Sequence, residues 1–216
     1  LYFIIYSFLG WCLESVYKTI LEKRFVNSGF LYGPLCPIYG FGAVIMILIF
    51  GLLPQNIFII FLSSMILLTI WEYIVGVILE KLFKTKYWDY SNVKFNINGR
   101  VCLNTIIPFG LLGMFIMYVS NPFLIGKIEA LPELELNIIS GALLTIFLLD
   151  NIISTNVISF VGKTTKEFGK SLDNTEEITN KVKEALLNKS GLYRRLLEAY
   201  PKVQSIKIKI KEKIGK

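Results

Sequence analysis

Three carboxylates lie within long apolar stretches of the sequence: Glu14, Glu72 and Asp150. An ionisable side chain inside a membrane span costs about 2.5–3.5 kcal/mol on insertion scales, so such residues typically mark ion pathways, proton relays or counter-ions. Arg100 and Asn104 stand one helical turn apart at the start of another apolar stretch. We expect these five residues to form a substrate- or ion-binding site that holds a cation, relays protons or orients a polar head group. Alternatively, Arg100 neutralises one acid, and the others are protonated or reach the interface.

The rest of the sequence offers little for catalysis or for cofactors. It contains no histidine, which is the commonest general base and transition-metal ligand. Its three cysteines, Cys12, Cys36 and Cys102, have no repeated spacing, so we expect neither a disulfide framework nor a zinc site. Residues 162–164 (GKT) imitate the end of a phosphate-binding loop, but Val157 stands where that motif needs glycine. We therefore expect no enzyme activity, no metal and no cofactor, and we expect any ATP to be bound by a partner.

Five apolar stretches are long enough to hold these residues in a bilayer, which needs about 20 residues to cross roughly 30 Å. The predicted fold is an all-α membrane protein with transmembrane helices at about 1–21, 34–53, 57–82, 101–120 and 136–161. The predicted transmembrane domain, residues 1–162, balances nine basic against nine acidic residues. The predicted tail, residues 163–216, has fourteen basic against seven acidic residues and so carries the whole net charge of +7. A basic tail tethered to a membrane suits an anionic lipid surface better than nucleic acid.

The predicted loops alternate in charge. The first loop, the third loop and the tail are basic, whereas the second loop is uncharged and the fourth is acidic. By the positive-inside rule, this pattern predicts an N-terminus outside, a C-terminus inside as a cytoplasmic tail, and an odd number of spans. Each of the three acids then lies roughly 20 Å below the start of its span, in the cytoplasmic half. The fourth loop, about residues 121–135, is predicted to lie in the interface or to dip back into the protein.

Two local patterns bear on packing. Glycines gather around the second predicted span and within the fourth, at positions 40, 42, 110 and 113. Small residues let membrane helices approach closely, so we interpret these positions as packing sites and not as a binding site. In the tail, residues 167–187 have a polar helical pattern, and residues 206–211 alternate isoleucine with lysine, as in an edge strand or a basic interfacial segment.

Several strings in the sequence resemble one bacterial family. They are GWCLE at 10–14, GFLYGPLCPIYG at 29–40, LEKLF at 79–83, WDYS at 88–91 and NGRVCL at 98–103. Over roughly residues 1–131 the chain resembles the family described as putative ABC-transporter type IV permeases, found largely in low-GC Gram-positive bacteria. The resemblance implies a permease-like, multi-pass subunit of the bacterial cytoplasmic membrane that works with a separate ATP-binding subunit. It adds four loop residues as partner contacts: Trp88, Asp89, Tyr90 and Asn98.

These observations leave three functional hypotheses. The first is a membrane transport component, either a homo-oligomer or part of a larger complex, in contact with membrane lipids. The second is a membrane enzyme acting on a lipid-linked substrate, with the carboxylates on Mg²⁺ and Arg100 on phosphate, since hard cations prefer oxygen ligands. The third is a non-catalytic scaffold whose tail is the working part. We favour the first, although a third loop of about 16–18 residues leaves room for only a short coupling helix on an ATPase.

Overall fold

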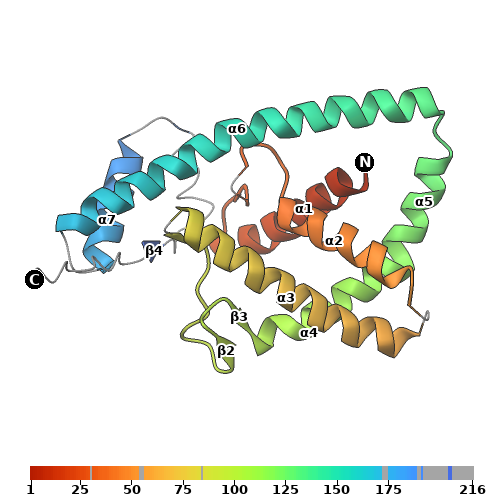
Figure 1. The fold of residues 1–216 in the computed structure, drawn as a ribbon, viewed down its shortest axis with the longest axis horizontal. Helices are drawn as coiled ribbons and strands as arrows, with labels where there is room; N and C mark the ends of the chain where they lie inside the picture. The colour runs from red at the N-terminus through yellow and green to blue at the C-terminus, as the bar shows by residue number, and fades with distance from the viewer. Residues whose placement is uncertain are drawn as a thin grey trace, which may run out of the picture.

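The computed structural model shows a mostly helical protein (Figure 1). It describes residues 1–29, 31–53, 56–83, 85–171, 175–188, 191 and 204–205. The helices are α1 (Tyr2–Glu22), α2 (Pro37–Phe50), α3 (Ile57–Phe83), α4 (Leu103–Phe115), the π-helical turn η1 (Ile116–Ser120), α5 (Asn121–Glu129), α6 (Glu133–Ser171) and α7 (Thr175–Leu187). Short strands in the described residues are β1 (Thr85–Lys86), β2 (Asn96–Ile97), β3 (Val101–Cys102) and β4 (Gln204–Ser205).

Within the described part of the chain, three helical segments are long and apolar enough to cross a membrane. They are α3, the continuous run Leu103–Glu129 formed by α4, η1 and α5, and the Glu133–Gly169 part of α6. They correspond to the third, fourth and fifth predicted spans, so the helical membrane fold is confirmed to that extent. By contrast, α1 carries Glu14, Lys18 and Glu22, and the 14 residues of α2 make only about 21 Å of helix. The five-span count and the orientation of the termini stay predictions.

One group of buried apolar side chains lies between α1, α2, α3 and the α4–η1 run, and we call it the membrane cluster. Its members are Tyr6, Ala43, Met46, Phe50, Ile60, Leu68, Ile116 and Met117. Glycines bring these helices together, because a Cβ on Gly40 would overlap Ser7 of α1 and a Cβ on Gly113 would overlap Ser64 of α3. This agrees with the packing role that the sequence predicts for these glycines.

Helix α5 occupies most of the predicted fourth loop. The backbone N–H of Asn121 donates to the carbonyl of Ile116, one residue further back than in an α-helix, and this widened turn forms η1. Pro122 then lies in the first turn of α5, where its missing N–H has no partner to lose. The helix that starts at Leu103 therefore continues to Glu129 instead of ending at residue 120.

A second group of buried apolar side chains lies between the C-terminal half of α6, helix α7 and the start of the loop after α3. We call it the tail cluster, and its members are Tyr87, Val157, Ile158, Val161, Ile178, Val182 and Leu186. In Figure 1, α7 lies against the C-terminal end of α6. Its three members of the cluster recur every four residues and so share one face of the helix. The last described strand, β4, pairs antiparallel with β1.

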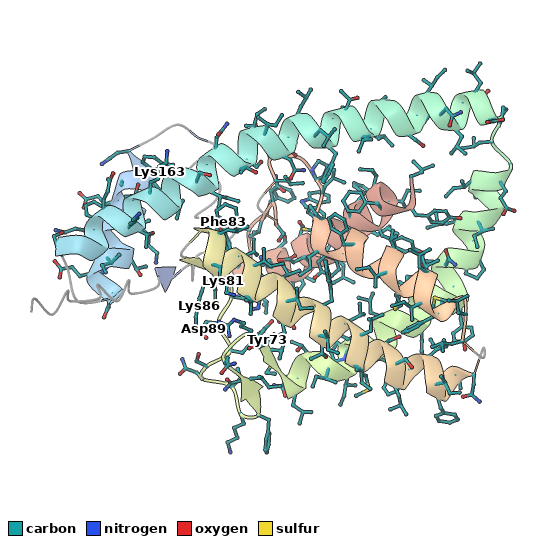
Figure 2. The ribbon with its side chains drawn as sticks, viewed as in Figure 1. Tyr73, Lys81, Phe83, Lys86, Asp89 and Lys163 are labelled. Carbon is teal, nitrogen blue, oxygen red and sulfur yellow. The ribbon has the colours of Figure 1, made fainter. Side chains whose placement is uncertain are left out.

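Helix α6 connects the predicted transmembrane domain to the predicted tail. It passes residue 162 without a break, so the predicted domain boundary falls inside this helix. A Cβ on Gly162 would lie 2.9 Å from the carbonyl oxygen of Phe83, so the GKT string is a site where α6 packs on the end of α3 (Figure 2). The predicted alternating segment, residues 206–211, lies outside the described residues.

Candidate functional site

Asp150 on α6 holds the loop that leads into α2. Its Oδ1 accepts a hydrogen bond from the backbone N–H of Tyr32 (2.8 Å), and its Oδ2 accepts one from the N–H of Gly33 (2.8 Å). The hydroxyl of Ser154 donates to Oδ1 as well (3.0 Å). A Cβ on Gly33 would lie 2.9 Å from Oδ2, so glycine permits this close approach. Both oxygens of this buried carboxylate are therefore engaged in fastening residues 32–33 to α6.

Glu14 on α1 lies between a lysine and a cysteine. Its Oε1 is 2.7 Å from the Nζ of Lys18, one helical turn away. The thiol of Cys36, just before α2, donates to its Oε2 at 3.6 Å. The side chain of Glu14 is about one-fifth exposed, so this pair is partly shielded from its surroundings.

Glu72 on α3 faces the start of α4. Its carboxyl lies beside the hydroxyl of Thr105, whose single proton is donated to the carbonyl of Cys102 (2.9 Å). The carboxyl oxygen Oε2 of Glu72 is buried without a hydrogen-bond partner among the described residues. A buried carboxyl oxygen with no donor costs free energy, so it marks a place where a proton or another cation would be stabilising.

The hydroxyls of two tyrosines, Tyr39 on α2 and Tyr90 in the loop after α3, lie within electrostatic range of both Glu14 and Glu72. Burial raises the pKa of Tyr90 well above its usual value, and the charge of Glu72 raises it further, so this hydroxyl stays a neutral hydrogen-bond donor. We call these four residues, Glu14, Tyr39, Glu72 and Tyr90, the carboxylate–tyrosine cluster.

Arg100 pairs with Glu80, an acid at the end of α3 that the sequence analysis did not select. Burial alone would lower the pKa of Arg100, but the hydrogen bond and the charge of Glu80 raise it above its usual value. The guanidinium also lies 5.3 Å from the ring centroid of Tyr73, a cation–π contact. The arrangement thus differs from the predicted one, in which Arg100 faces the three intramembrane acids. Glu80 and Arg100 lie at the two ends of the same loop, which brings the carboxylate of Glu80 to the guanidinium of Arg100.

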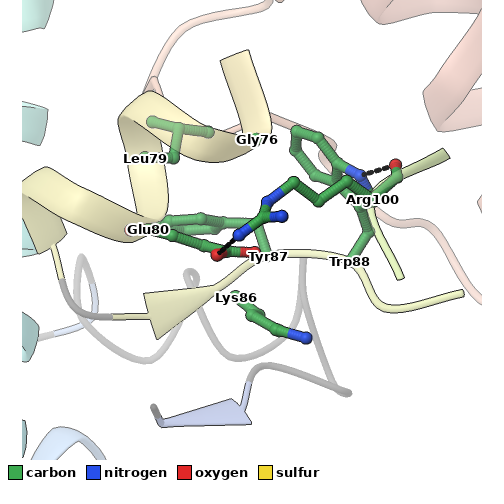
Figure 3. A pocket seen from close by; sticks show the side chains of 7 residues that line it. All are labelled: Gly76, Leu79, Glu80, Lys86, Tyr87, Trp88 and Arg100. Carbon is green, nitrogen blue, oxygen red and sulfur yellow. Dashed lines mark hydrogen bonds and ion pairs between the residues drawn. The ribbon is translucent and has the colours of Figure 1, made fainter. Parts of the chain in front are cut away.

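A small cavity lies beside this ion pair (Figure 3). Its lining includes Gly76, Glu80, Trp88 and Arg100, and its volume of about 10 Å³ corresponds to one water molecule at most. The indole N–H of Trp88 donates to the carbonyl of Arg100 (2.8 Å), which closes one side. Gly76 lies beside both side chains, and a Cβ there would be in ordinary van der Waals contact with them at 3.4–3.5 Å. The cavity is too small for an organic substrate, and the hydrogen bond and the ion pair around it hold the loop against α3.

The other predicted loop residues build a rigid turn. Asn98 and Gly99 both have positive φ, 54° and 70°, and the N–H of Arg100 bonds to the carbonyl of Ile97 (3.0 Å), as in a type I′ hairpin turn. The N–H of Tyr90 donates to the carbonyl of Gly99 (2.8 Å). The amide of Asn98 donates to the hydroxyl of Tyr73 on α3 (2.8 Å). The hairpin is thereby tied to α3.

Asp89 stabilises the same turn. Its Oδ1 accepts hydrogen bonds from the N–H and the hydroxyl of Ser91, and the Nζ of Lys86 lies 3.7 Å away (Figure 2). Partial burial raises its pKa, but the Ser91 hydrogen bonds and Lys86 lower it more, so its pKa lies below the usual value. A Cβ on Gly99 would lie 2.5 Å from this carboxylate oxygen, so only glycine fits. Asn104, in contrast, is exposed on α4.

Sequence reasoning missed four residues that complete these contacts: Tyr39, Tyr73, Glu80 and Thr105. The sequence did contain a signal for Glu80. Glu72, Gly76 and Glu80 recur every four residues and so share one face of α3. Within the described residues, no group of three or more His, Cys, Asp or Glu side chains is placed to hold a metal ion.

The fold and the site define a helical membrane protein that carries carboxylates, Glu72 and Asp150, on two of its long apolar helices. The chain belongs to the family described as Putative ABC-transporter type IV, whose model matches residues 1–155. The protein is thus a membrane component related to ABC transporters, as its sequence strings predicted. Comparisons with curated proteins and with solved structures find no match.

Proposed function

We propose that this chain is the membrane-embedded subunit of a bacterial transport system and works with a separate subunit that binds ATP. Three observations support the proposal: the family match over residues 1–155, the apolar helices, and the absence of a complete phosphate-binding loop from the sequence. The partner supplies the energy of ATP hydrolysis, and this chain supplies the path through the bilayer.

The carboxylate–tyrosine cluster carries the proposal. Glu14 and Glu72 come from different helices and lie within electrostatic range of the same two tyrosines, while the Oε2 of Glu72 has no donor among the described residues. Such a site suits a cationic group or a proton, because carboxylates and neutral hydroxyls together offer negative charge and hydrogen bonds. Asp150 and Arg100 act as positioning residues in this scheme, because their partners are a backbone loop and Glu80.

The loop between α3 and α4 is the proposed docking element for the partner. Trp88, Asp89 and Asn98 hold its conformation by internal hydrogen bonds, so the loop is rigid before the partner binds. A preorganised surface loses little entropy on association. The short loop thereby compensates for the lack of room for a long coupling helix.

The test is purification of the tagged chain from its native membrane, followed by mass spectrometry and by ATP hydrolysis in proteoliposomes. An ATP-binding subunit should copurify, and Glu72→Gln should lower the ATPase activity of the complex without lowering its yield. Thr69→Ala on the same helix serves as the matched control. Purification of the chain without any nucleotide-binding partner, or full activity of Glu72→Gln, would contradict the proposal.

A further inference from the structure

The loop between α3 and α4 ends in a tip, residues 93–97, that displays apolar side chains. Phe95 is 79% exposed and Ile97 is 56% exposed. The tip is rigid, since the amide of Asn96 donates to the carbonyl of Val93 (2.8 Å) and β2 pairs with β3. Phe95 has a φ of 55°, an unfavourable backbone conformation for a bulky residue. The loop therefore holds an aromatic ring outward at some cost in backbone strain.

The exposed ring continues an apolar stripe on a membrane-spanning segment. Leu103, Ile107, Leu111 and Phe115 recur every four residues along α4, and each is about half exposed. On a helix this spacing gives one face, which in a span of this hydropathy is the face toward lipid. The N–H of Leu103 donates to the carbonyl of Phe95 (3.2 Å), so Phe95 lies beside the first turn of that span.

We propose that residues 93–97 are a lipid anchor, in which Phe95 and Ile97 insert at the boundary between head groups and acyl chains where α4 begins. Aromatic side chains are favoured at this level of a bilayer. Lys94 lies between them in sequence and is exposed, and among the residues that the structure describes no carboxylate lies within ion-pair distance of it. Lys94 contacts the phosphate of an anionic head group.

Lipid is the occupant because the apolar surface of the tip is continuous with the lipid-facing stripe of α4. Trp88 and Asp89 of the same loop have other neighbours, since Trp88 packs against the tail cluster and Asp89 lies 3.7 Å from Lys86. The anchor goes beyond the proposed transport function and holds whether or not the protein transports anything. It assigns the tip of the loop, residues 93–97, to lipid and leaves the part with Trp88 and Asp89 for the proposed partner.

The experiment places a nitroxide spin label at Phe95→Cys and at Asn92→Cys in the full chain, reconstituted in vesicles of phosphatidylglycerol and phosphatidylethanolamine. Asn92 is the matched control, since it is exposed on the same loop outside the apolar tip. The unsubstituted protein, labelled identically, gives the background from Cys12, Cys36 and Cys102. Ile97→Cys provides a second reporter if labelling at 95 disturbs the strained backbone. The measurement is relaxation of each label by oxygen, which concentrates in lipid, and by a water-soluble nickel chelate.

If the tip is a lipid anchor, oxygen should relax the label at position 95 more strongly than the nickel chelate does. At position 92 the nickel chelate should relax the label more strongly than oxygen does. Ile97→Cys should behave like 95. The proposal is overturned if nickel dominates at both 95 and 97, which would place the tip in water. It is equally overturned if both labels are shielded from both reagents, which would mean that protein, such as a second copy of this chain, covers the tip.

Discussion

The two halves of α6 carry similar apolar side chains and place them in opposite environments. In the first half, residues 133–149, no residue is buried, and Ile138 and Ile146 are 62% and 61% exposed. In the second half, Val157 and Val161 are 4% and 0% exposed within the tail cluster. One continuous helix therefore runs from a stretch without buried residues into a buried core shared with α7 (Figure 1).

The difference illustrates that the free-energy gain from burying an apolar side chain depends on the surrounding solvent. In water, burial of apolar surface is favourable by roughly 25 cal/mol per Å², so the largely polar helix α7 gains by packing its apolar face on the second half of α6. In lipid that gain vanishes, and helices associate through close packing of small residues instead. The membrane cluster accordingly depends on its glycines, whereas the tail cluster depends on its large side chains. Substitutions in the membrane cluster and in the tail cluster should therefore have different effects on stability.

The largest effect is expected for Gly40→Leu in the membrane cluster. The new side chain would overlap Ser7 and the backbone of α1, so we expect a loss of about 3 kcal/mol or more, at the upper end of overpacking effects. Gly141→Leu on α6 is the matched control, because nothing lies within 4 Å of a Cβ there. The measurement is the thermal unfolding midpoint in detergent. Equal midpoints for the two variants would refute a membrane cluster that depends on close helix approach.

Leu186→Ala should come next, with a local effect on the tail cluster. Leu186 is fully buried and its neighbour Leu187 is 50% exposed, so the first substitution should cost about 3 kcal/mol and Leu187→Ala almost nothing. Hydrogen exchange followed by mass spectrometry should show faster exchange in α7 and in the second half of α6, with α2 and α3 unchanged. Faster exchange in α2 as well would mean that the two clusters unfold as one unit.

Asp150→Asn should have a smaller effect at the contact between α6 and the loop before α2. The amide cannot accept from both Tyr32 and Gly33, so one backbone N–H loses a charge-assisted bond at a cost of about 1.5–3 kcal/mol. Exchange at the amides of residues 32 and 33 should accelerate. The exposed Thr155→Ala on the same helix should leave it unchanged. Unchanged exchange in Asp150→Asn would show that another contact holds the loop.

Much of the fold was predictable from the sequence, because long apolar runs have few alternatives to helices in lipid. The third, fourth and fifth spans appear close to their predicted positions. The predicted end of the fourth span was wrong. Pro122 indicates a helix end in the sequence, but the π-turn η1 precedes it and the helix continues to Glu129. The tail cluster could not be foreseen either, because Tyr87 and α7 are distant in sequence.

The candidate site was only partly predictable. The spacing of charges identified residues that are costly in a membrane, and Glu14 and Glu72 lie within electrostatic range of the same two tyrosines. That they form a binding site stays a prediction. The choice of partners followed local geometry, which no spacing encodes. Arg100 pairs with Glu80 across one loop. Asp150 accepts two backbone N–H groups, and a backbone donor has no signature in the sequence.

The smallest predicted effect is the pH response of the loop that lies between the two clusters. The folded-state pKa of Asp89 lies below its unfolded value of about 3.8. Its contribution to stability is therefore fully present above that value and is lost as the pH falls through the folded-state pKa. Tryptophan emission, which includes Trp88, should show an Asp89-dependent shift only below about pH 4. Asp89→Asn, which cannot ionise, should lack this shift. A transition centred above the unfolded value would mean that Asp89 is destabilised in the folded loop, contrary to its hydrogen bonds with Ser91.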